Sequence, residues 1–239
     1  MSEPAEKPSA PVGVEPVPAA SVILLRDAPA GLEVLMLRRT AKASFAADAW
    51  VFPGGRIDPE DGVDPGSVDA ARRGAARETR EEAGIVIDPG SLVPFSRWCP
   101  PPESPKRFLT WLFVAAAPAE DDVTVDGGEI TEHEWVIPAE AIAARDEGRI
   151  TLLPPTWVTL WELSHRGSVA DVLAAASRDE PPYFETHIAF VAREDDPEKK
   201  EVVSLWEGDA GYADRDPSAP GARHRLRMGD PPWRYERTG

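Results

Sequence analysis

Three glutamates fall within one short, arginine-flanked stretch of this sequence, at Glu78, Glu81 and Glu82. A helix advances about 100° per residue, so Glu78 and Glu82 would share one face with Glu81 beside it, and their oxygens would converge on one small volume. Carboxylates at that spacing repel unless a cation lies between them. Hard oxygen ligands suit Mg²⁺ or Mn²⁺, which complete their shells with water and substrate phosphates. The stretch therefore predicts a divalent-metal site on one helix.

The alternative is a solvated acidic helix face, in which Arg77 and Arg80 form ion pairs with the glutamates. That is the commoner meaning of clustered glutamates. The surrounding sequence favours the metal site, because a Gly54-Gly55 turn follows a short apolar strand. An acidic loop and an alanine-rich helix come next, and the helix ends at Gly84.

This arrangement resembles the Nudix hydrolases, whose box reads Gly, five residues, Glu, seven residues, Arg-Glu-apolar-any-Glu-Glu-any-Gly-apolar. The second half of the box is present, with Thr79 in place of the usual aliphatic residue, as Arg77, Glu78, Glu81, Glu82, Gly84 and Ile85. In the first half, Asp69 stands eight residues before Arg77, where the family has Glu. Gly55 lies fourteen residues before Asp69 where six are expected, which implies an insertion of eight residues between turn and helix.

The resemblance implies an α+β Nudix fold, an α/β/α sandwich with a mixed β-sheet and a loop-rich C-terminal extension. It also implies hydrolysis of a diphosphate in a nucleoside diphosphate derivative, with Mg²⁺ or Mn²⁺ as cofactor. We expect the metal ligands to be Glu78, Glu81, Glu82 and the Gly55 carbonyl, and the catalytic residues to be Glu78, Glu81 and Arg77. Glu81 is either the third ligand or a base acting through bound water. Arg77 would orient a carboxylate such as Asp69, for which helix capping is an equal alternative.

A further carboxylate from a later strand commonly completes such sites, and the candidates here are Glu129, Glu132 and Glu134. Strand alternation places Glu132 and Glu134 on the face of Ile130 and leaves Glu129 on the other face. The sequence does not select among the three.

Several stretches outside the box indicate the substrate. Residues 35–40, which lead to 52–55, resemble the signature that precedes the box in coenzyme A diphosphatases, although Thr40 replaces its Ser and 45–50 lacks its Gly and His. Stretches resembling acyl-coenzyme A diphosphatases lie at 98–100, 105–110 and 153–156. The implied substrate is coenzyme A or acyl-coenzyme A, and the products are adenosine 3′,5′-bisphosphate and (acyl-)4′-phosphopantetheine.

Coenzyme A also carries a 3′-phosphate, so an acidic protein needs local cations to bind it. We expect Arg38, Arg39 and Arg107 to contact the substrate, with Arg39 and Arg107 as the leading pair for the 3′-phosphate. Two other readings stay open. One is a diphosphatase of ADP-ribose or a nucleoside diphosphate sugar, and the other is a catalytically silent, nucleotide-binding regulatory Nudix domain.

The resemblance implies a small nucleotide-derived partner, and the composition argues against some other classes of partner. A net charge of −16 over 239 residues argues against a nucleic-acid polymer, whose binding needs clustered Lys and Arg. The single cysteine, Cys99, excludes an intrachain disulfide and fits a buried structural thiol. No apolar run reaches eighteen residues and the N-terminus lacks a signal-peptide pattern, so we expect a cytoplasmic protein with no membrane partner.

The chain divides into a disordered tail at 1–18, a Nudix domain at 19–165 and an extension at 166–239. We expect the extension to pack on the core or to form a homodimer contact. Expected strands lie at 19–26, 32–39, 50–52, 92–98, 108–116, 130–136, 187–192, 202–206 and 223–228. Expected helices run from Ser67 or Asp69, either of which could cap the first, to Ala83, and over 138–147, 156–165 and 169–177.

Overall fold

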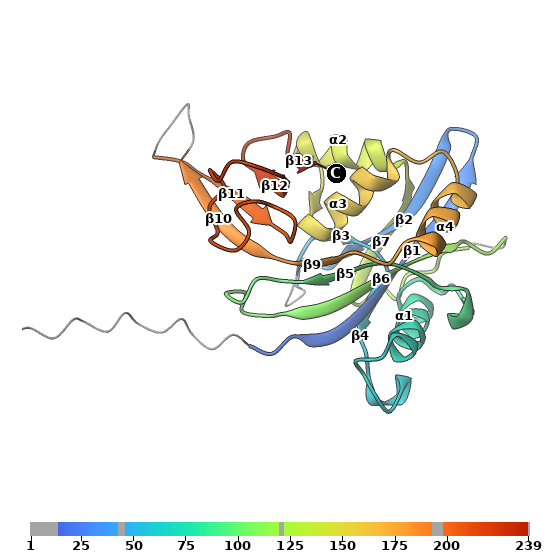
Figure 1. The fold of residues 1–239 in the computed structure, drawn as a ribbon. Coiled ribbons are helices and arrows are strands. Elements are labelled where there is room, and N and C mark those ends of the chain that lie inside the picture. The colour runs from blue at the N-terminus through green and yellow to red at the C-terminus, as the bar shows by residue number, and fades with distance from the viewer. Residues whose placement is uncertain (1–13, 43–45, 120–121, 193–197, 239) are drawn as a thin grey trace, which may run out of the picture.

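A mixed β-sheet with helices on both faces forms the body of the protein (Figure 1). The computed structural model describes residues 14–42, 46–119, 122–192 and 198–238. Residues 1–13 of the expected tail lie outside the described residues.

The elements follow in two lists. The strands are β1 Val17–Ala28, β2 Gly31–Arg39, β3 Ala49–Val51, β4 Gly54–Arg56, β5 Val93–Cys99, β6 Phe108–Ala116, β7 Ile130–Val136, β8 Thr151–Leu152, β9 Tyr183–Glu185, β10 His187–Ala192, β11 Lys200–Leu205, β12 His224–Met228 and β13 Arg234–Arg237. The helices are α1 Val68–Ala83, α2 Pro138–Asp146, α3 Pro154–Leu163 and α4 Val169–Arg178, with short 3₁₀ turns η1 Pro59–Asp61 and η2 Pro89–Ser91.

The main sheet runs in the order β8-β3-β2-β1-β6-β5-β9, with β4 paired to β1 and β7 paired to β2. Its centre is parallel, because β1 and β6 run side by side in the same direction. Alternate residues of β1 enter two different cores: Val22 and Leu24 pack under α1, while Ile23 and Leu25 pack under α2, α3 and α4. Both faces are therefore covered, which explains why β1 reads as a continuous apolar run.

Helix α1 has clear start and stop signals. The Ser67 side chain caps it by accepting a hydrogen bond from the Ala70 N–H, so Ser67 and not Asp69 is the cap. Gly84 ends the helix with φ 73°, and its N–H donates to the Arg80 carbonyl. The small alanines let α1 lie close to the sheet, where it contacts β1 and β4.

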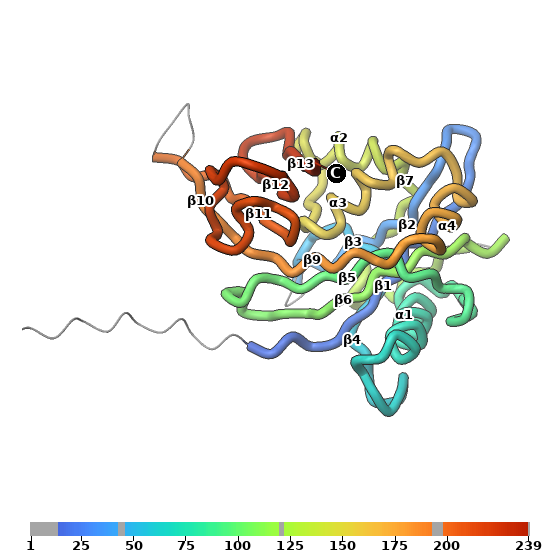
Figure 2. The backbone as a smooth tube through the Cα atoms, viewed as in Figure 1, coloured from blue at the N-terminus to red at the C-terminus, as the bar shows by residue number. Residues whose placement is uncertain are grey.

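The C-terminal region joins the same core. Strand β9 adds to the main sheet beside β5, and β10 to β13 form a separate antiparallel sheet. Trp206 and Leu226 of that sheet region are fully buried in the core under α2 to α4. Figure 2 shows the last strands lying beside α3, where the Trp161 and Tyr235 rings are 5.0 Å apart.

The α+β class and the main helices and strands are confirmed, with shifted boundaries. β1 begins at Val17, because Val17 already pairs with Phe108 in β6. The sequence did not predict β4, β8, β9 or β13, which have four residues or fewer and little apolar periodicity. Cys99 is buried, as expected.

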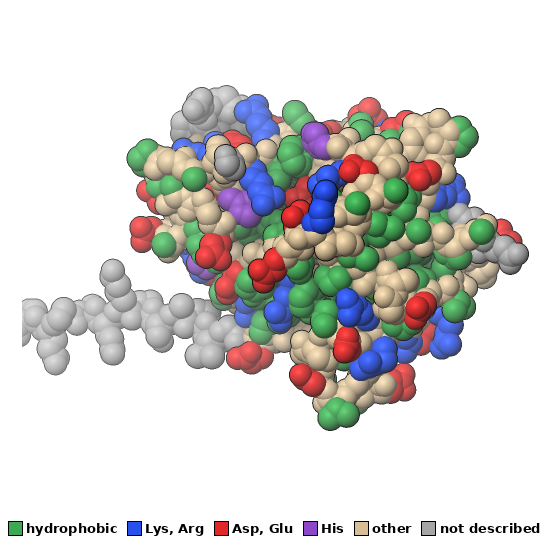
Figure 3. Space-filling model, turned by 45° about the vertical axis from the view of Figure 1, so that its right-hand side comes forward, with side chains coloured by type: hydrophobic (Ala, Val, Ile, Leu, Met, Phe, Trp, Pro, Cys, Tyr) green, Lys and Arg blue, Asp and Glu red, His purple; other side chains and the backbone are tan. Residues whose placement is uncertain are grey.

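Acidic and basic side chains are interspersed over the face of the molecule that Figure 3 shows. Among the described residues, no helix has the length and apolar character needed to cross a membrane.

Candidate active site

Two glycines bring backbone directly against the carboxylates of α1. The Gly54 N–H donates a hydrogen bond to Glu82 Oε2 at 2.9 Å. Gly54 has φ 153°, and a Cβ there would overlap Ser21 and the Ala20 carbonyl. A Cβ on Gly55 would overlap the Glu78 carboxylate. Glycine at position 54 therefore permits β4 to lie against β1, and glycine at position 55 permits it to lie against Glu78.

Burial sets the protonation of these two carboxylates. Glu82 is 6% exposed, and its desolvation raises its pKa to about 7 despite the Gly54 hydrogen bond, which acts in the other direction. Desolvation also raises the pKa of Glu78, and the neighbouring Arg77 offsets part of that rise. Burial disfavours the charged form of both carboxylates, and a bound metal cation would stabilise that form in place of a proton. The pair is therefore suited to bind a metal cation.

Arg77 is the centre of a second cluster of charges. Its Nε and Nη2 donate to the two oxygens of Asp61 at 3.1 and 3.0 Å. Its Nη1 donates to Glu78 Oε1 at 3.0 Å and to Glu81 Oε2 at 3.1 Å, and Nη2 also donates to the Arg56 carbonyl at 3.0 Å. The guanidinium therefore ties the loop after β4 to the acidic face of α1.

The expected pairing of Arg77 with Asp69 is wrong, because Asp69 is exposed and pairs with Arg72 at 3.2 Å. Asp61 takes that role and is 4% exposed. It lies six residues after Gly55, the spacing that the box expects, while sixteen residues separate it from Arg77. The insertion therefore follows Asp61. Counting forward from Gly55 instead of backward from Arg77 would have found this residue.

The expected convergence of the three glutamates on one volume is also wrong in this conformation. Glu82 turns toward Gly54 and lies 3.9 Å from Arg39, whereas Glu78 and Glu81 turn toward Arg77. Within the described ranges, no three acidic, histidine or cysteine side chains gather closely enough to hold a metal ion. Each carboxylate is instead held by its nearest arginine, which relieves the repulsion between like charges.

Strand β7 contains a register shift that changes which of its residues face α1. Arg38 lies opposite Glu132, but Arg39 lies opposite Ile130, so Thr131 is an extra residue. The shift puts Ile130 under α1, which corrects the expectation that it shares a face with Glu132.

Glu129 directly precedes β7 and lies at the site. Its Oε2 accepts a hydrogen bond from Arg39 at 3.3 Å, and its charge contributes to the raised pKa of Glu82. Glu132 pairs with Arg38 at 2.8 Å, and Glu134 lines a cavity on the opposite face of the sheet. Glu129 is therefore the acidic residue of the three that lies with the α1 carboxylates.

The three expected substrate arginines lie in different surroundings. Arg39 is at the site, between Glu82 and Glu129, and its Nε is buried without a partner. Arg38 is on the other face of β2, paired with Asp48 at 2.7 Å and with Glu132.

Arg107 is held by the backbone of its own neighbourhood. It donates to the carbonyls of Val14 and Pro100, at 3.0 and 3.1 Å, and to Cys99 Sγ at 3.2 Å. The structure thus does not bring Arg107 together with Arg39.

The donor chemistry fits a hard divalent cation. Glu78 and Glu82 supply oxygens one helical turn apart, both disfavoured as uncompensated charges by burial, and Gly55 leaves room beside Glu78. Glu81 is about half exposed and Glu129 mostly so, which leaves both free to turn.

Comparisons with known proteins identify the family of the chain. The NUDIX domain model matches residues 15–154. A nudix hydrolase of Caenorhabditis elegans, number 7, is 26% identical over 64% of this chain and 61% of its own length. The m7GpppN-mRNA hydrolase NUDT17 of Bos taurus is 29% identical over 48% of this chain and 41% of its own. The chain thus spans about half the length of these curated relatives.

Among solved structures, a NUDIX hydrolase from Alicyclobacillus acidocaldarius superposes with a TM-score of 0.62 at 21% identity, over 67% of this chain and 96% of that one. This likeness confirms the expected Nudix fold. Because the domain model covers more than half of the sequence, the chain belongs to the Nudix family.

Proposed function

We propose that this protein is a metal-dependent hydrolase that cleaves the diphosphate linkage of a nucleoside diphosphate derivative. The observation that carries the proposal is the pair Glu78 and Glu82 on one face of α1, with Glu82 buried against Gly54 and Glu78 half-buried against Gly55. Desolvation disfavours the charged form of both carboxylates, so both gain from a cation, and a diphosphate supplies the remaining oxygen ligands.

Each residue of the site has a defined task in this proposal. Glu78 and Glu82 would hold Mg²⁺ or Mn²⁺, with Glu81, Glu129 and the Gly55 carbonyl as further donors. The bound cation would neutralise charge on the diphosphate and lower the pKa of a water molecule. Glu81, more exposed than its neighbours, is placed to accept the proton of the attacking water.

Arg77 would act by position. Its guanidinium holds Glu78 and Glu81, and Asp61 fixes the plane of that guanidinium. The acidic face of α1 would therefore keep one geometry while substrate enters. A positively charged Arg39 would leave its carboxylate partners for phosphate oxygens once a cation takes its place.

We further propose coenzyme A or acyl-coenzyme A as the substrate. Support comes from the sequence stretches around the box that resemble coenzyme A diphosphatases, and from Arg39 at the edge of the site. ADP-ribose is the second candidate substrate, and a silent nucleotide-binding domain is the candidate of another class. The intact Glu78, Glu81 and Glu82 set favours an enzyme.

The test is a substrate screen with coenzyme A, an acyl-coenzyme A, ADP-ribose, NADH and, because of the Bos taurus relative, m7GpppA. Each is incubated with Mg²⁺ or Mn²⁺, and products are separated by chromatography. We expect adenosine 3′,5′-bisphosphate from coenzyme A, and none from a folded Glu82→Gln variant. Turnover of another substrate alone would replace the coenzyme A assignment, and no metal-dependent turnover of any would support the silent domain.

A further inference from the structure

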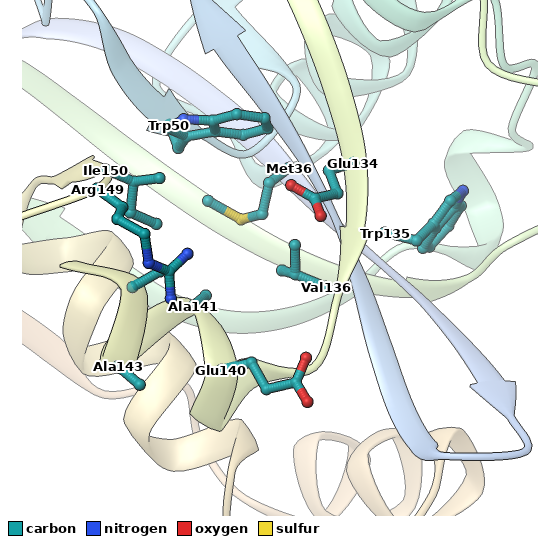
Figure 4. A pocket seen from close by; sticks show the side chains of 11 residues that line it. Met36, Trp50, Glu134, Trp135, Val136, Glu140, Ala141, Ala143, Arg149 and Ile150 are labelled. Atoms are coloured by element: carbon teal, nitrogen blue, oxygen red, sulfur yellow. The ribbon is translucent and has the colours of Figure 1, made fainter. Parts of the chain in front are cut away.

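A cavity of about 280 Å³ opens on the face of the main sheet that is opposite α1 (Figure 4). Its floor and walls are apolar. Met36, Ala141 and Trp50 are 1%, 3% and 8% exposed, and Val136 and Ile150 are half-buried beside them. The indole of Trp50 forms one wall, so the cavity offers a flat aromatic surface above an apolar floor.

The rim of the cavity is acidic. Glu134 and Glu140 line it, and within the part of the chain that the structure describes neither side chain has a hydrogen-bond or ion-pair partner. Arg149 also lines the rim, but Glu147 engages it at 2.7 Å. Carboxylates accept hydrogen bonds and donate none, so the rim favours a group with N–H donors and repels phosphate.

Strand β2 connects the cavity with the α1 site, because it carries a residue of each. Met36 is three residues before Arg39 on β2, which corresponds to roughly 10 Å along the strand. Arg39 is 3.9 Å from Glu82. A base in the cavity and a diphosphate at the α1 site would therefore belong to one nucleotide that bends around the end of β2.

We propose that this cavity binds the base of the substrate as an aminopurine, stacked on Trp50, with its exocyclic amine donating to Glu134. This inference rests on the proposed function for the identity of the rest of the ligand. The charges of the two sites determine which part of the substrate each one binds. Phosphates are attracted to the α1 site, where a metal cation and Arg39 would lie, and are repelled by the unpaired carboxylates of the cavity. Of the uncharged parts of the substrate, the base is the flat aromatic one that can stack on Trp50.

The rim carboxylates only accept hydrogen bonds, so we expect the bound base to carry an amino group that donates them. A purine without donors gains stacking on Trp50 but leaves the Glu134 oxygens unsatisfied by the ligand. An exocyclic amine supplies donors that form charge-assisted hydrogen bonds with a carboxylate. Both adenine and guanine carry such an amine, and the experiment separates them.

The test measures binding of nucleosides to the full chain without metal, by ligand-observed NMR titration. Two matched pairs differ only in the amine: adenosine against purine riboside, and guanosine against inosine. In at least one pair, we expect the amine to tighten binding about tenfold. The pair that shows the effect identifies the base, and ribose 5-phosphate, which lacks a base, should not bind.

Three variants locate the effect. Glu134→Ala, at an exposed position, should bring the ratio within the responding pair close to one. The matched control is Glu132→Ala, two residues away on β7 but outside the cavity and paired with Arg38, which should keep the ratio. Trp50→Leu should weaken every nucleoside.

Equal binding within both pairs, or a ratio that survives in Glu134→Ala, would overturn the proposal. Because the nucleosides carry no diphosphate and no metal is added, the outcome is independent of hydrolysis. Nucleoside discrimination without any turnover would leave the cavity assignment standing while the proposed function fails.

Discussion

The Arg77 guanidinium donates two parallel hydrogen bonds, of 3.1 and 3.0 Å, to the carboxylate of Asp61, which lies sixteen positions earlier in the sequence. The carboxylate is buried, and its second task is to accept the Asp58 N–H at 2.8 Å, which closes the loop after β4. This paired geometry gives the loop and the acidic helix face one fixed relationship.

We predict that Arg77→Lys lowers the turnover number about 10- to 100-fold while the Michaelis constant changes little. Lysine keeps the charge but cannot hold Asp61, Glu78 and Glu81 at once. Asp61→Asn should reproduce much of the loss in steady-state kinetics. The matched control is Asp69→Asn, whose partner is Arg72, and an equal loss in that variant would contradict the assignment of Asp61.

Glu82 makes metal-free stability depend on pH. Its folded pKa, raised by burial to about 7, exceeds its ordinary value of 4.5. The stabilisation from this group is therefore complete below pH 4.5 and is lost as the pH rises through 7. Relative to wild type, we expect Glu82→Gln to be more stable by on the order of 2–3 kcal/mol above pH 7, measured by urea denaturation.

Glu82→Gln should also lose most of the rise in Tm that Mn²⁺ produces in wild type, since one ligand charge is gone. Gln can still accept the Gly54 N–H, so the fold should be kept. An unchanged Mn²⁺ shift at pH 8 would remove Glu82 from the metal site.

His224 has the opposite dependence. Burial lowers its pKa below 6.5, and the neutral ring suits hydrogen bonds with the Glu207 carbonyl and the Tyr235 hydroxyl. Its contribution is fully present above pH 6.5 and is lost as the pH falls through the folded pKa, by at most about 1.4 kcal/mol per pH unit. Urea denaturation of His224→Gln from pH 7.5 to 5 should lack this decline. Parallel curves for variant and wild type would contradict it.

Gly55→Ala should reduce activity with little change in Tm. The added Cβ meets the end of the flexible Glu78 side chain, which can move away and so lose its position in the site. The control is Gly167→Ala, where nothing lies within 4 Å of the added Cβ. Wild-type activity in Gly55→Ala would show that Glu78 does not need its present position.

Arg39→Ala and Arg107→Ala should have different effects on the catalytic efficiencies for coenzyme A and 3′-dephospho-coenzyme A. Arg39 remains the candidate for the 3′-phosphate, so its loss should weaken coenzyme A by about 1–3 kcal/mol and spare 3′-dephospho-coenzyme A. Arg107 binds carbonyls that join Val14 to Pro100, and its loss should lower the free energy of unfolding and affect both substrates equally. Catalytic efficiencies on the two substrates decide, and an equal loss in Arg39→Ala would dismiss it as the phosphate contact.

The local sequence determined the elements that carry the site. Ser67, the alanines and Gly84 specify the start, the buried face and the end of α1, and the spacing of Glu78 and Glu82 places both beside the glycine turn. These features depend on the helical period and on contacts between residues a few positions apart. Both can be read from the spacing of residues in the sequence.

Tertiary structure decided which distant groups meet the helix. Asp61 and not Asp69 reaches Arg77, because the loop folds back from β4. One extra residue in β7 turns Ile130 toward α1, since a shift of one residue reverses the face of a strand, and Glu129, just before β7, meets Arg39. Neither outcome leaves a local pattern, because both depend on how separate segments pack in three dimensions.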